Sequence, residues 1–236
     1  GKSGVLEPEQ IEAAIRPDDV HNPPTKLVVL ENTHNRGCGK IYPIEKIAAI
    51  RELTKKHKIA MHLDGARIFN ACVATGKSPQ EYARYFDSLM FCFSKGLGAP
   101  VGSIVAGSKE FIKKAHRYRK MLGGAMRQVG ILAAAADYSL EHNVERLAED
   151  HQNAQILAKA LSAIDGFTIN PAEVETNIII FEVNSSLFNV NEVIERLAKM
   201  GVLMIPFGSK YVRAVTHLDV SREKIKSAVK IIQEVF

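Results

Sequence analysis

The stretch from Lys58 to Gly107 begins with KIAMHLDGAR and ends with DSLMFCFSKGLGAPVGSIVAG. Two apolar runs in it, Ile59–Leu63 and Ser88–Phe93, are rich in residues that favour strands, so we predict a buried strand for each. Soon after each run comes a charged residue followed by glycine, first Asp64 and then Lys95. Because the carboxyl ends of parallel strands open into a common crevice where ligands bind, we expect both side chains there.

Two opposite charges in such a crevice need a chemical reason, because a lone buried charge is costly. Pyridoxal phosphate supplies one, since a lysine holds this cofactor as a Schiff base and a carboxylate pairs with its pyridine nitrogen. The alternative is a structural ion pair between Asp64 and Lys95 at the edge of a sheet. These two residues alone leave both interpretations open.

Five motifs follow one another along the chain. They are ENTHN at 31–35, HLDGARIFNA at 62–71, FSKGLGAPVGS at 93–103, GGAMRQ at 123–128 and VRAVTHLDVSR at 212–222. They resemble motifs of the low-specificity L-threonine aldolases, fold-type I enzymes of the aspartate aminotransferase superfamily, and because they are spread from residue 31 to residue 222 the resemblance covers nearly the whole chain. The resemblance implies a pyridoxal-phosphate enzyme that cleaves L-threonine or L-allo-threonine to glycine and acetaldehyde.

Two other interpretations remain open. One is a different fold-type I lyase or an aminotransferase, against which ENTHN and the loop around His21 argue. The other is a chain that only folds or assembles, because the family has a further N-terminal part with a glycine-rich phosphate loop and a histidine stacked on the cofactor. We expect this chain to be incomplete as an enzyme without such a segment.

The resemblance implies roles for several residues. Lys95 would carry the cofactor, and Asp64 would keep its pyridine nitrogen protonated, although an Asp before glycine also commonly caps a turn. His21 would bind the substrate and help to remove its hydroxyl proton, because histidine titrates in the required range. His34 is a second acid–base candidate, unless it orients neighbouring loops.

Three arginines complete the implied site. Arg67 and Arg213 would bind the substrate carboxylate, because the guanidinium fork matches a carboxylate bidentately. Arg67 would also contact the cofactor, and the alternative for it is a surface position at a helix start. Arg127 would reach the cofactor phosphate of a neighbouring subunit from a predicted helix start. We predict no catalytic metal, since His34 and Cys38 are joined by no second pair of ligands.

The composition is that of an ordinary globular protein. The 236 residues are 46% hydrophobic and 24% charged, with a net charge of +5. No apolar run approaches the roughly 20 residues of a membrane span. The three scattered cysteines, Cys38, Cys72 and Cys92, are typical of reduced thiols in the cytoplasm. The basic clusters at 55–58 and 113–120 lack the motifs of nucleic-acid binding, so we expect no nucleic-acid or membrane partner.

The order of the predicted elements indicates two domains. Strands alternate with helices, as in a parallel α/β sheet, up to a long helical stretch at about 127–164 in which we expect a bend. The later order of strand, strand, helix, strand, strand, helix predicts a small α+β domain. The predicted late strands are Phe167–Ile169, Asn177–Val183, Val202–Ile205 and Tyr211–Val215. We therefore predict a partial cofactor-binding large α/β domain at 1–150 and a small domain at 151–236.

The basic helix predicted at 108–121 also bears on assembly. Arg127 follows it, and the resemblance places this region near the cofactor of a second subunit. A cationic helix needs an anionic partner or solvent. We therefore expect a homodimer or a homotetramer with shared active sites.

Overall fold

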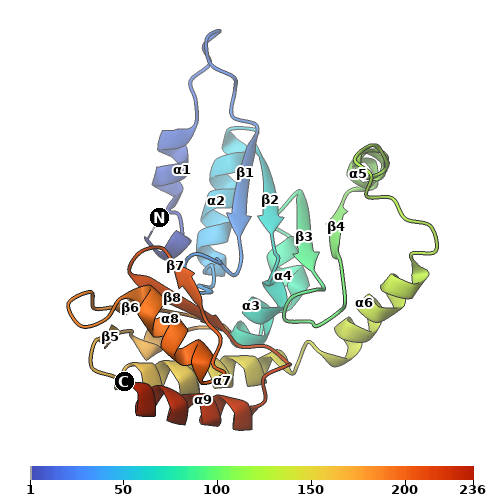
Figure 1. Cartoon of the computed structure of the whole chain (residues 1–236). Helices are drawn as coiled ribbons and strands as arrows, with labels where there is room; N and C mark the ends of the chain where they lie inside the picture. Colours follow the sequence, from blue (N-terminus) through green and yellow to red (C-terminus); the bar gives the residue numbers. More distant parts are fainter. Residues whose placement is uncertain (1) are drawn as a thin grey trace. The chain divides into compact units, whose positions relative to one another are not determined.

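The computed structural model describes residues 2–236, and these fall into two compact units (Figure 1). Unit 1 runs up to Gly37 and again over Ile41–Glu145, and unit 2 comprises Cys38–Lys40 and Arg146–Phe236. The predicted boundary after residue 150 would fall inside the helix Leu147–Leu161, which belongs wholly to unit 2. The assignment of a large cofactor-binding domain and a small domain stays a prediction.

Unit 1 alternates strands and helices over most of its length. Its elements are η1 (Lys2–Gly4), α1 (Pro8–Ala14), β1 (Leu27–Glu31), α2 (Ile44–Lys56), β2 (Ala60–Asp64), α3 (Ile68–Thr75), α4 (Pro79–Ala83), β3 (Ser88–Cys92), β4 (Ser103–Gly107), α5 (Lys109–Met121) and α6 (Gly130–His142). In the described part of the chain its strands form one sheet in the order β1-β2-β3-β4.

The register of this sheet places the ends of its strands at one edge. β1, β2 and β3 are parallel, and Glu31, the last residue of β1, pairs with Asp64, the last residue of β2. Asp64 pairs in turn with Met90 of β3, and β4 is antiparallel to β3. The predicted parallel α/β arrangement is therefore confirmed.

The core of unit 1 lies on one face of the sheet. Side chains on this face pack against helices and are buried, and those from β1 and β2 are Val28, Leu30, Met61 and Leu63. Leu27 and Val29 alternate with them on the other face and are 51% and 50% exposed. For β3 the prediction of a buried strand was wrong, because all of its residues are only partly buried.

Local chemistry accounts for where several helices begin. The Ser78 hydroxyl accepts the backbone N–H of Glu81 at 3.3 Å, and the Glu81 carboxylate accepts the N–H of Ser78 at 2.7 Å. This reciprocal pair satisfies two of the free N–H groups at the start of α4, and Pro79 provides the first helical residue. The predicted helix start at Ser78 is confirmed.

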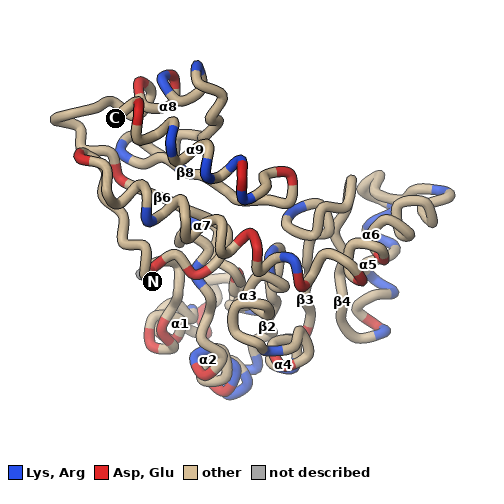
Figure 2. Tube along the Cα trace, turned by 90° about the horizontal axis from the view of Figure 1, so that it is seen from below, with Lys and Arg blue, Asp and Glu red and all other residues tan. Residues whose placement is uncertain are grey.

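The basic helix and the helical stretch after it differ in how well they match prediction. α5 occupies nearly the predicted range, none of its described residues is buried, and Figure 2 shows Lys and Arg recurring along it. The stretch predicted at 127–164 is two helices, α6 and α7 (Leu147–Leu161), with a break at 143–146 where the bend was expected. The Asn143 N–H returns to the Ser139 carbonyl, which ends α6.

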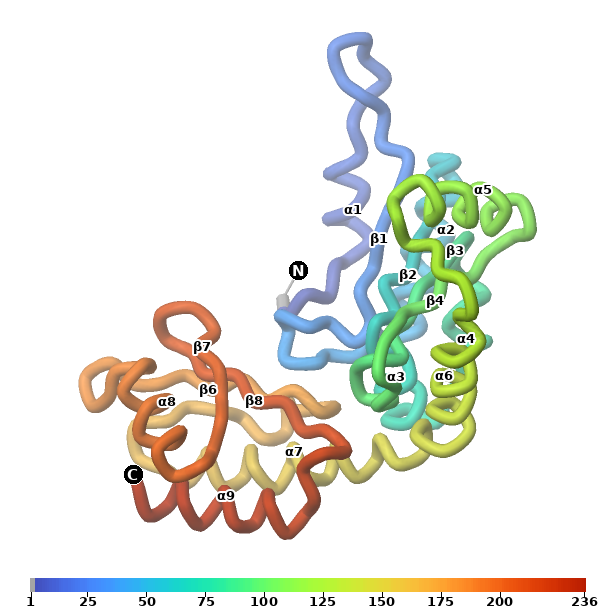
Figure 3. The backbone as a smooth tube through the Cα atoms, turned by 45° about the vertical axis from the view of Figure 1, so that its right-hand side comes forward, coloured from blue at the N-terminus to red at the C-terminus, as the bar shows by residue number. Residues whose placement is uncertain are grey.

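Unit 2 has the predicted α+β order. Its elements are α7 (Leu147–Leu161), β5 (Phe167–Thr168), η2 (Pro171–Glu173), β6 (Ile178–Val183), α8 (Val190–Lys199), β7 (Ile205–Phe207), β8 (Tyr211–Val215) and α9 (Arg222–Val235). Within the described residues the strands form an antiparallel sheet in the order β5-β6-β8-β7. α7 and α9 pack against each other beneath this sheet in Figures 1 and 3.

The strand predicted at Val202–Ile205 was placed too early. β7 begins at Ile205, because the Val202 N–H donates to the Leu197 carbonyl at 2.9 Å and closes the end of α8. Gly201 has a φ of +83°, the left-handed conformation that commonly ends a helix. The apolar residues after Gly201 therefore start as a helix cap rather than as a strand.

Three residues, Cys38–Lys40, belong to unit 2, although the residues before and after them in the sequence belong to unit 1. We call these three residues the strap. The Lys40 ammonium lies 2.7 Å from the Glu175 carboxylate, and the Thr176 hydroxyl donates to the Gly39 carbonyl at 2.8 Å. Gly39 has a φ of +67°, and a Cβ there would lie 2.3 Å from the Thr176 hydroxyl oxygen. Glycine is therefore required at this position.

Among the described residues, none of the helices combines the length and the apolar character that crossing a membrane requires.

One carboxylate ties a helix of unit 1 to two strands. Asp87 accepts both guanidinium branches of Arg51 from α2, at 2.7 and 2.8 Å, and also the backbone N–H of Met61 in β2 at 2.8 Å. The hydrogen bonds from Arg51 are the main reason that the pKa of Asp87 is lowered. Asp87 comes just before β3, so it fixes α2 against the middle of the sheet.

We expect Asp87→Asn to destabilise the protein at neutral pH by about 1 kcal/mol, since the side chain is 45% exposed and partly screened. A lowered folded pKa means that this stabilisation is present above the ordinary Asp value of about 3.9 and is lost as the pH falls through the lower folded value. Urea denaturation at pH 7 and pH 3 should show a smaller deficit at pH 3 than at pH 7. Asp137→Asn, an exposed change on α6, is the control, and equal stability of Asp87→Asn and wild type at pH 7 would contradict the expectation.

Candidate active site

Asp64 occupies a tight turn at the carboxyl end of β2. One of its carboxylate oxygens accepts the Ala66 N–H at 3.1 Å, and the Gly65 N–H donates to the Met90 carbonyl of β3 at 2.9 Å. A Cβ on Gly65 would lie 2.8 Å from that carbonyl oxygen. The turn is therefore pressed against β3, and Asp64 has the turn-capping contact considered from the sequence while it also faces a cavity.

Lys95 lies in a loop that follows β3 and is held by backbone hydrogen bonds. The Phe93 N–H donates to the Gly102 carbonyl at 3.0 Å, and the Ala99 N–H donates to the Phe93 carbonyl at 3.0 Å. The Lys95 carbonyl accepts the N–H of Gly98, whose φ of +73° favours glycine. The half-buried Lys95 is thus presented from a fixed loop at the edge of the sheet where Asp64 lies.

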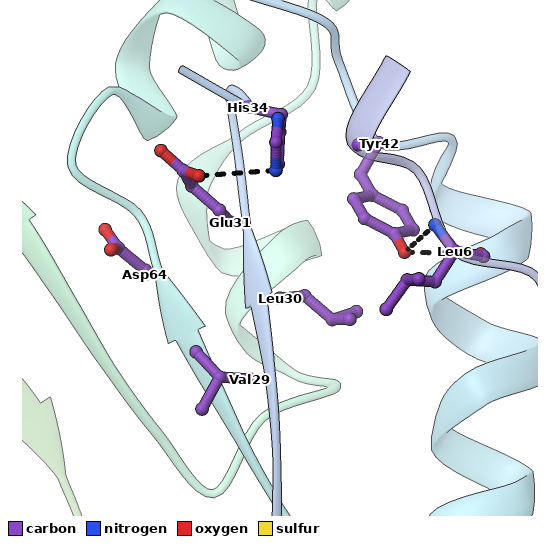
Figure 4. A pocket seen from close by; sticks show the side chains of 8 residues that line it. Leu6, Val29, Leu30, Glu31, His34, Tyr42 and Asp64 are labelled. Carbon is purple, nitrogen blue, oxygen red and sulfur yellow. Dashed lines mark hydrogen bonds and ion pairs between the residues drawn. The ribbon is translucent and has the colours of Figure 1, made fainter. Parts of the chain in front are cut away.

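A cavity of about 390 Å³ opens at the carboxyl ends of β1 and β2 (Figure 4). Its polar lining comes from Glu31, His34, Tyr42 and Asp64. The Tyr42 hydroxyl accepts the backbone N–H of Leu6 at 2.6 Å, which fixes one wall. The sequence reasoning did not select Glu31, although a signal was present: Glu31 ends its strand as Asp64 ends the next.

Arg67 lies against the ENTHN loop of unit 1. It precedes α3, is half-buried, and donates from Nη1 to the side-chain oxygen of Asn35 at 3.3 Å. The backbone N–H of Asn35 donates to the Glu31 carboxylate at 3.1 Å. The structure thus links Arg67 to the loop beside the cavity, which differs from the alternative of a free surface position.

Arg213 belongs to β8 of unit 2. It pairs across the sheet with Ile180 and Ile205, whereas its neighbour Val212 is fully buried in the core of that unit. Arg213 therefore points to the sheet face away from the core and is only half-buried. Burial lowers its pKa, but a guanidinium keeps its charge at neutral pH.

Of the predicted site residues in unit 1, Asp64 and His34 line the cavity, whereas Lys95, Arg67, His21 and Arg127 do not. His21 lies in the loop between α1 and β1, which Figures 1 and 3 show extending from the starting end of β1, opposite to Asp64. Its side chain is 87% exposed, with the ring 2.9 Å from the Asp19 carboxylate. Arg127 is exposed in the connection from α5 to α6, on the β4 side of the unit.

Comparison with known proteins identifies the family. The model of the beta-eliminating lyase family matches residues 1–184, which includes the turn at Asp64 and the loop at Lys95. The chain belongs to this family. As a beta-eliminating lyase family member, it is similar to the low-specificity L-threonine aldolase of Escherichia coli K12, with 45% identity over 222 residues, 94% of this chain and 64% of that protein. The resemblance predicted from the motifs is confirmed.

Solved structures show the same fold. The threonine aldolase of Leishmania major superposes with a TM-score of 0.78 at 20% identity, covering 100% of this family member and 68% of that chain. A tetra mutant of aspartate aminotransferase from Thermus thermophilus superposes with a TM-score of 0.68 at 20% identity, covering 98% and 64%. The predicted fold-type I class is therefore confirmed.

The chain spans only part of the length of its relatives. It covers 64 to 67% of the length of the first curated relatives it matches. Among the described residues, no group of three or more His, Cys, Asp or Glu side chains is arranged to hold a metal ion. The absence of a catalytic metal itself stays a prediction.

One hydrogen bond outside the loop should govern its mobility. The Asn143 amide donates to the Leu97 carbonyl at 2.7 Å, which joins the end of α6 to the lysine loop. We expect Asn143→Ala to speed hydrogen exchange at the amides of Phe93, Gly98 and Ala99 about fivefold, since losing a net hydrogen bond costs about 1 kcal/mol of local stability. Native-state exchange read by NMR measures this, with the exposed change Glu141→Ala as control. Unchanged exchange in the loop would show that Asn143 does not hold it.

Proposed function

We propose that this chain provides much of the active site of a pyridoxal-phosphate-dependent aldolase that cleaves L-threonine or L-allo-threonine to glycine and acetaldehyde. The observation that carries the proposal is the delivery of Asp64 and Lys95 to one edge of a parallel sheet by neighbouring strands. The similarity to a protein named low specificity L-threonine aldolase supports the substrate.

The residues present fit pyridoxal phosphate in their chemistry. Asp64 lines a cavity of about 390 Å³, within the size range of small-molecule sites, and Lys95 follows the adjacent strand. Asp64 would hold the proton on the ring nitrogen, and the Lys95 amine would hold the cofactor covalently. When bound, the cofactor supplies an electron sink for the pair released as Cα–Cβ breaks.

The substrate carboxylate would be held by two arginines. Arg67 already lies against the loop beside the cavity, and Arg213 is a half-buried guanidinium on a rigid strand. Partial burial strengthens a charge-assisted contact, because less water competes for the charge. A fixed carboxylate would orient the amino acid so that the bond to be broken is placed consistently.

The proton of the substrate hydroxyl would go to His21, with acetaldehyde leaving as Cα–Cβ breaks. Since the loop that carries His21 extends from the starting end of β1 and the side chain is exposed, we infer that a second copy of the chain supplies this histidine. Arg127 of a second copy would likewise bind the cofactor phosphate. We therefore propose a homodimer or homotetramer with shared active sites.

The proposed enzyme acts in the cytoplasm on a small amino acid, without nucleic-acid or membrane partners. Cys38, Cys72 and Cys92 are free thiols, which suits a reducing compartment. Burial raises the pKa of the Cys72 thiol to about 12, so this cysteine is protonated and unreactive at neutral pH.

The proposal is tested by the attachment site of the cofactor. After borohydride reduction of the complete protein loaded with pyridoxal phosphate, we expect peptide mass mapping to find the pyridoxyl group on Lys95. Lys95→Gln should lose the label and lower threonine cleavage at least a thousandfold, because both attachment and positioning are lost. Cleavage is followed as glycine and acetaldehyde, and Lys77→Gln on the surface is the control. A label on another lysine would overturn the assignment, and transamination products would favour an aminotransferase.

Arg213→Lys tests the substrate contact separately from the cofactor. Losing a bidentate charged hydrogen bond costs about 1.5–3 kcal/mol, so kcat/KM for threonine should fall roughly 10- to 150-fold. Cofactor absorbance should stay unchanged, because the contact is to substrate. Arg196→Lys on the exposed face of α8 is the matched control. Normal kinetics would place Arg213 outside the site, and lost absorbance would make it a cofactor contact.

A further inference from the structure

The ENTHN loop holds one histidine in a single orientation. The backbone N–H of Gly37 donates to Nδ1 of His34 at 2.9 Å, and Nε2 of the same ring lies 3.5 Å from the Glu31 carboxylate (Figure 4). A ring nitrogen that accepts a hydrogen bond carries no proton, so the proton of the neutral ring is on Nε2. His34 therefore presents an N–H to Glu31.

The ring has no room to turn away from this arrangement. A Cβ at Gly4 would lie 2.1 Å from Nδ1, so the N-terminal segment packs directly on the imidazole. The side chain is only 23% exposed. To act as a base through Nδ1, His34 would have to give up the Gly37 bond and displace that segment. Its geometry is that of a positioning residue.

The residue that His34 positions is Glu31. The two oxygens of its carboxylate face different donors, one accepting the Asn35 N–H at 3.1 Å and the other facing His34. Glu31 pairs with Asp64 in the parallel ladder, and both side chains line the same cavity. In Figure 4 their carboxylates lie on the same side of β1.

The charges around this cavity are unbalanced. Of the described residues that line it, two are carboxylates and none is Lys or Arg. Two neighbouring carboxylates of like charge repel each other. A cationic or protonated group placed in the cavity would relieve that repulsion, which makes the pair complementary to a protonated ring nitrogen.

We propose that Glu31 is a second carboxylate of the cofactor site, held beside Asp64 by His34 and by the backbone N–H of Asn35. Its negative charge helps Asp64 to keep the cofactor's ring nitrogen protonated. This inference rests on the proposed function, because it requires pyridoxal phosphate at Asp64. The negative charge of Glu31 stabilises the protonated ring nitrogen electrostatically, and His34 contributes by holding Glu31 in place. Neither residue takes a proton from the substrate.

The test follows the ring nitrogen itself. Complete protein is loaded with pyridoxal phosphate that carries ¹⁵N in the ring, and the ¹⁵N chemical shift is recorded against pH. Asp64→Asn is compared with Asp64→Asn/Glu31→Gln, since removing Asp64 brings the titration into an accessible range. Glutamine keeps an oxygen for the Asn35 N–H, so the loop stays closed. We expect Glu31→Gln to lower the ring-nitrogen pKa by about one unit, a tenfold change in the protonated fraction.

Controls separate this role from general damage to the loop. Glu52→Gln, an exposed change on α2, should leave the titration unchanged, and His34→Asn should shift it in the same direction as Glu31→Gln. Glu31→Gln is also compared with wild type without the Asp64 change. Superimposable titrations with and without Glu31 in both backgrounds would overturn the proposal. Failure of wild type to bind the cofactor at Lys95 would instead overturn the proposed function, and it is observed before any variant is made.

Discussion

The hydrogen-bond ladder that joins β1, β2 and β3 in parallel is the constraint on which the candidate site depends. It brings Glu31, Asp64 and the Lys95 loop to one edge through backbone pairing, so side chains from distant parts of the chain meet there. The same ladder turns Met61 and Leu63 into the core and Asp64 toward the cavity. A slip of one residue would reverse these faces, so the chemistry and the core are fixed by one register.

The part of the site that sequence predicts well is the part set by local rules. Asp64 and Lys95 follow strand-forming runs and precede glycine, and a strand end in a parallel sheet is a recognisable place for chemistry. Glu31 and His34 could not be assigned in this way, because their arrangement comes from a loop that closes on Gly37 and on the N-terminal segment. Such contacts are absent from any short window of sequence.

The helices and strands also differ in how well the sequence predicts them, for the same reason. The capping box at Ser78 is complete within four residues, and its helix begins where the sequence indicates. The late start of β7 depends on Val202 bonding back to Leu197, a competition between helix cap and strand that apolar pattern does not decide. The exposure of β3 depends on what covers the sheet. Propensity is a local quantity, whereas burial is a property of the assembled layers.

The strap at Cys38–Lys40 has a consequence for the order of folding. Its polar bonds to Glu175 and Thr176 join residues 135 and 137 positions apart, so unit 2 cannot be completed when the strap leaves the ribosome. At ordinary rates of synthesis its partners emerge roughly 7 to 27 seconds later. During that time the strap, which includes the half-buried Cys38, lacks its contacts with Glu175 and Thr176. The final fitting of unit 2 is therefore a late event that draws on a segment made 135 residues before its partner Glu175.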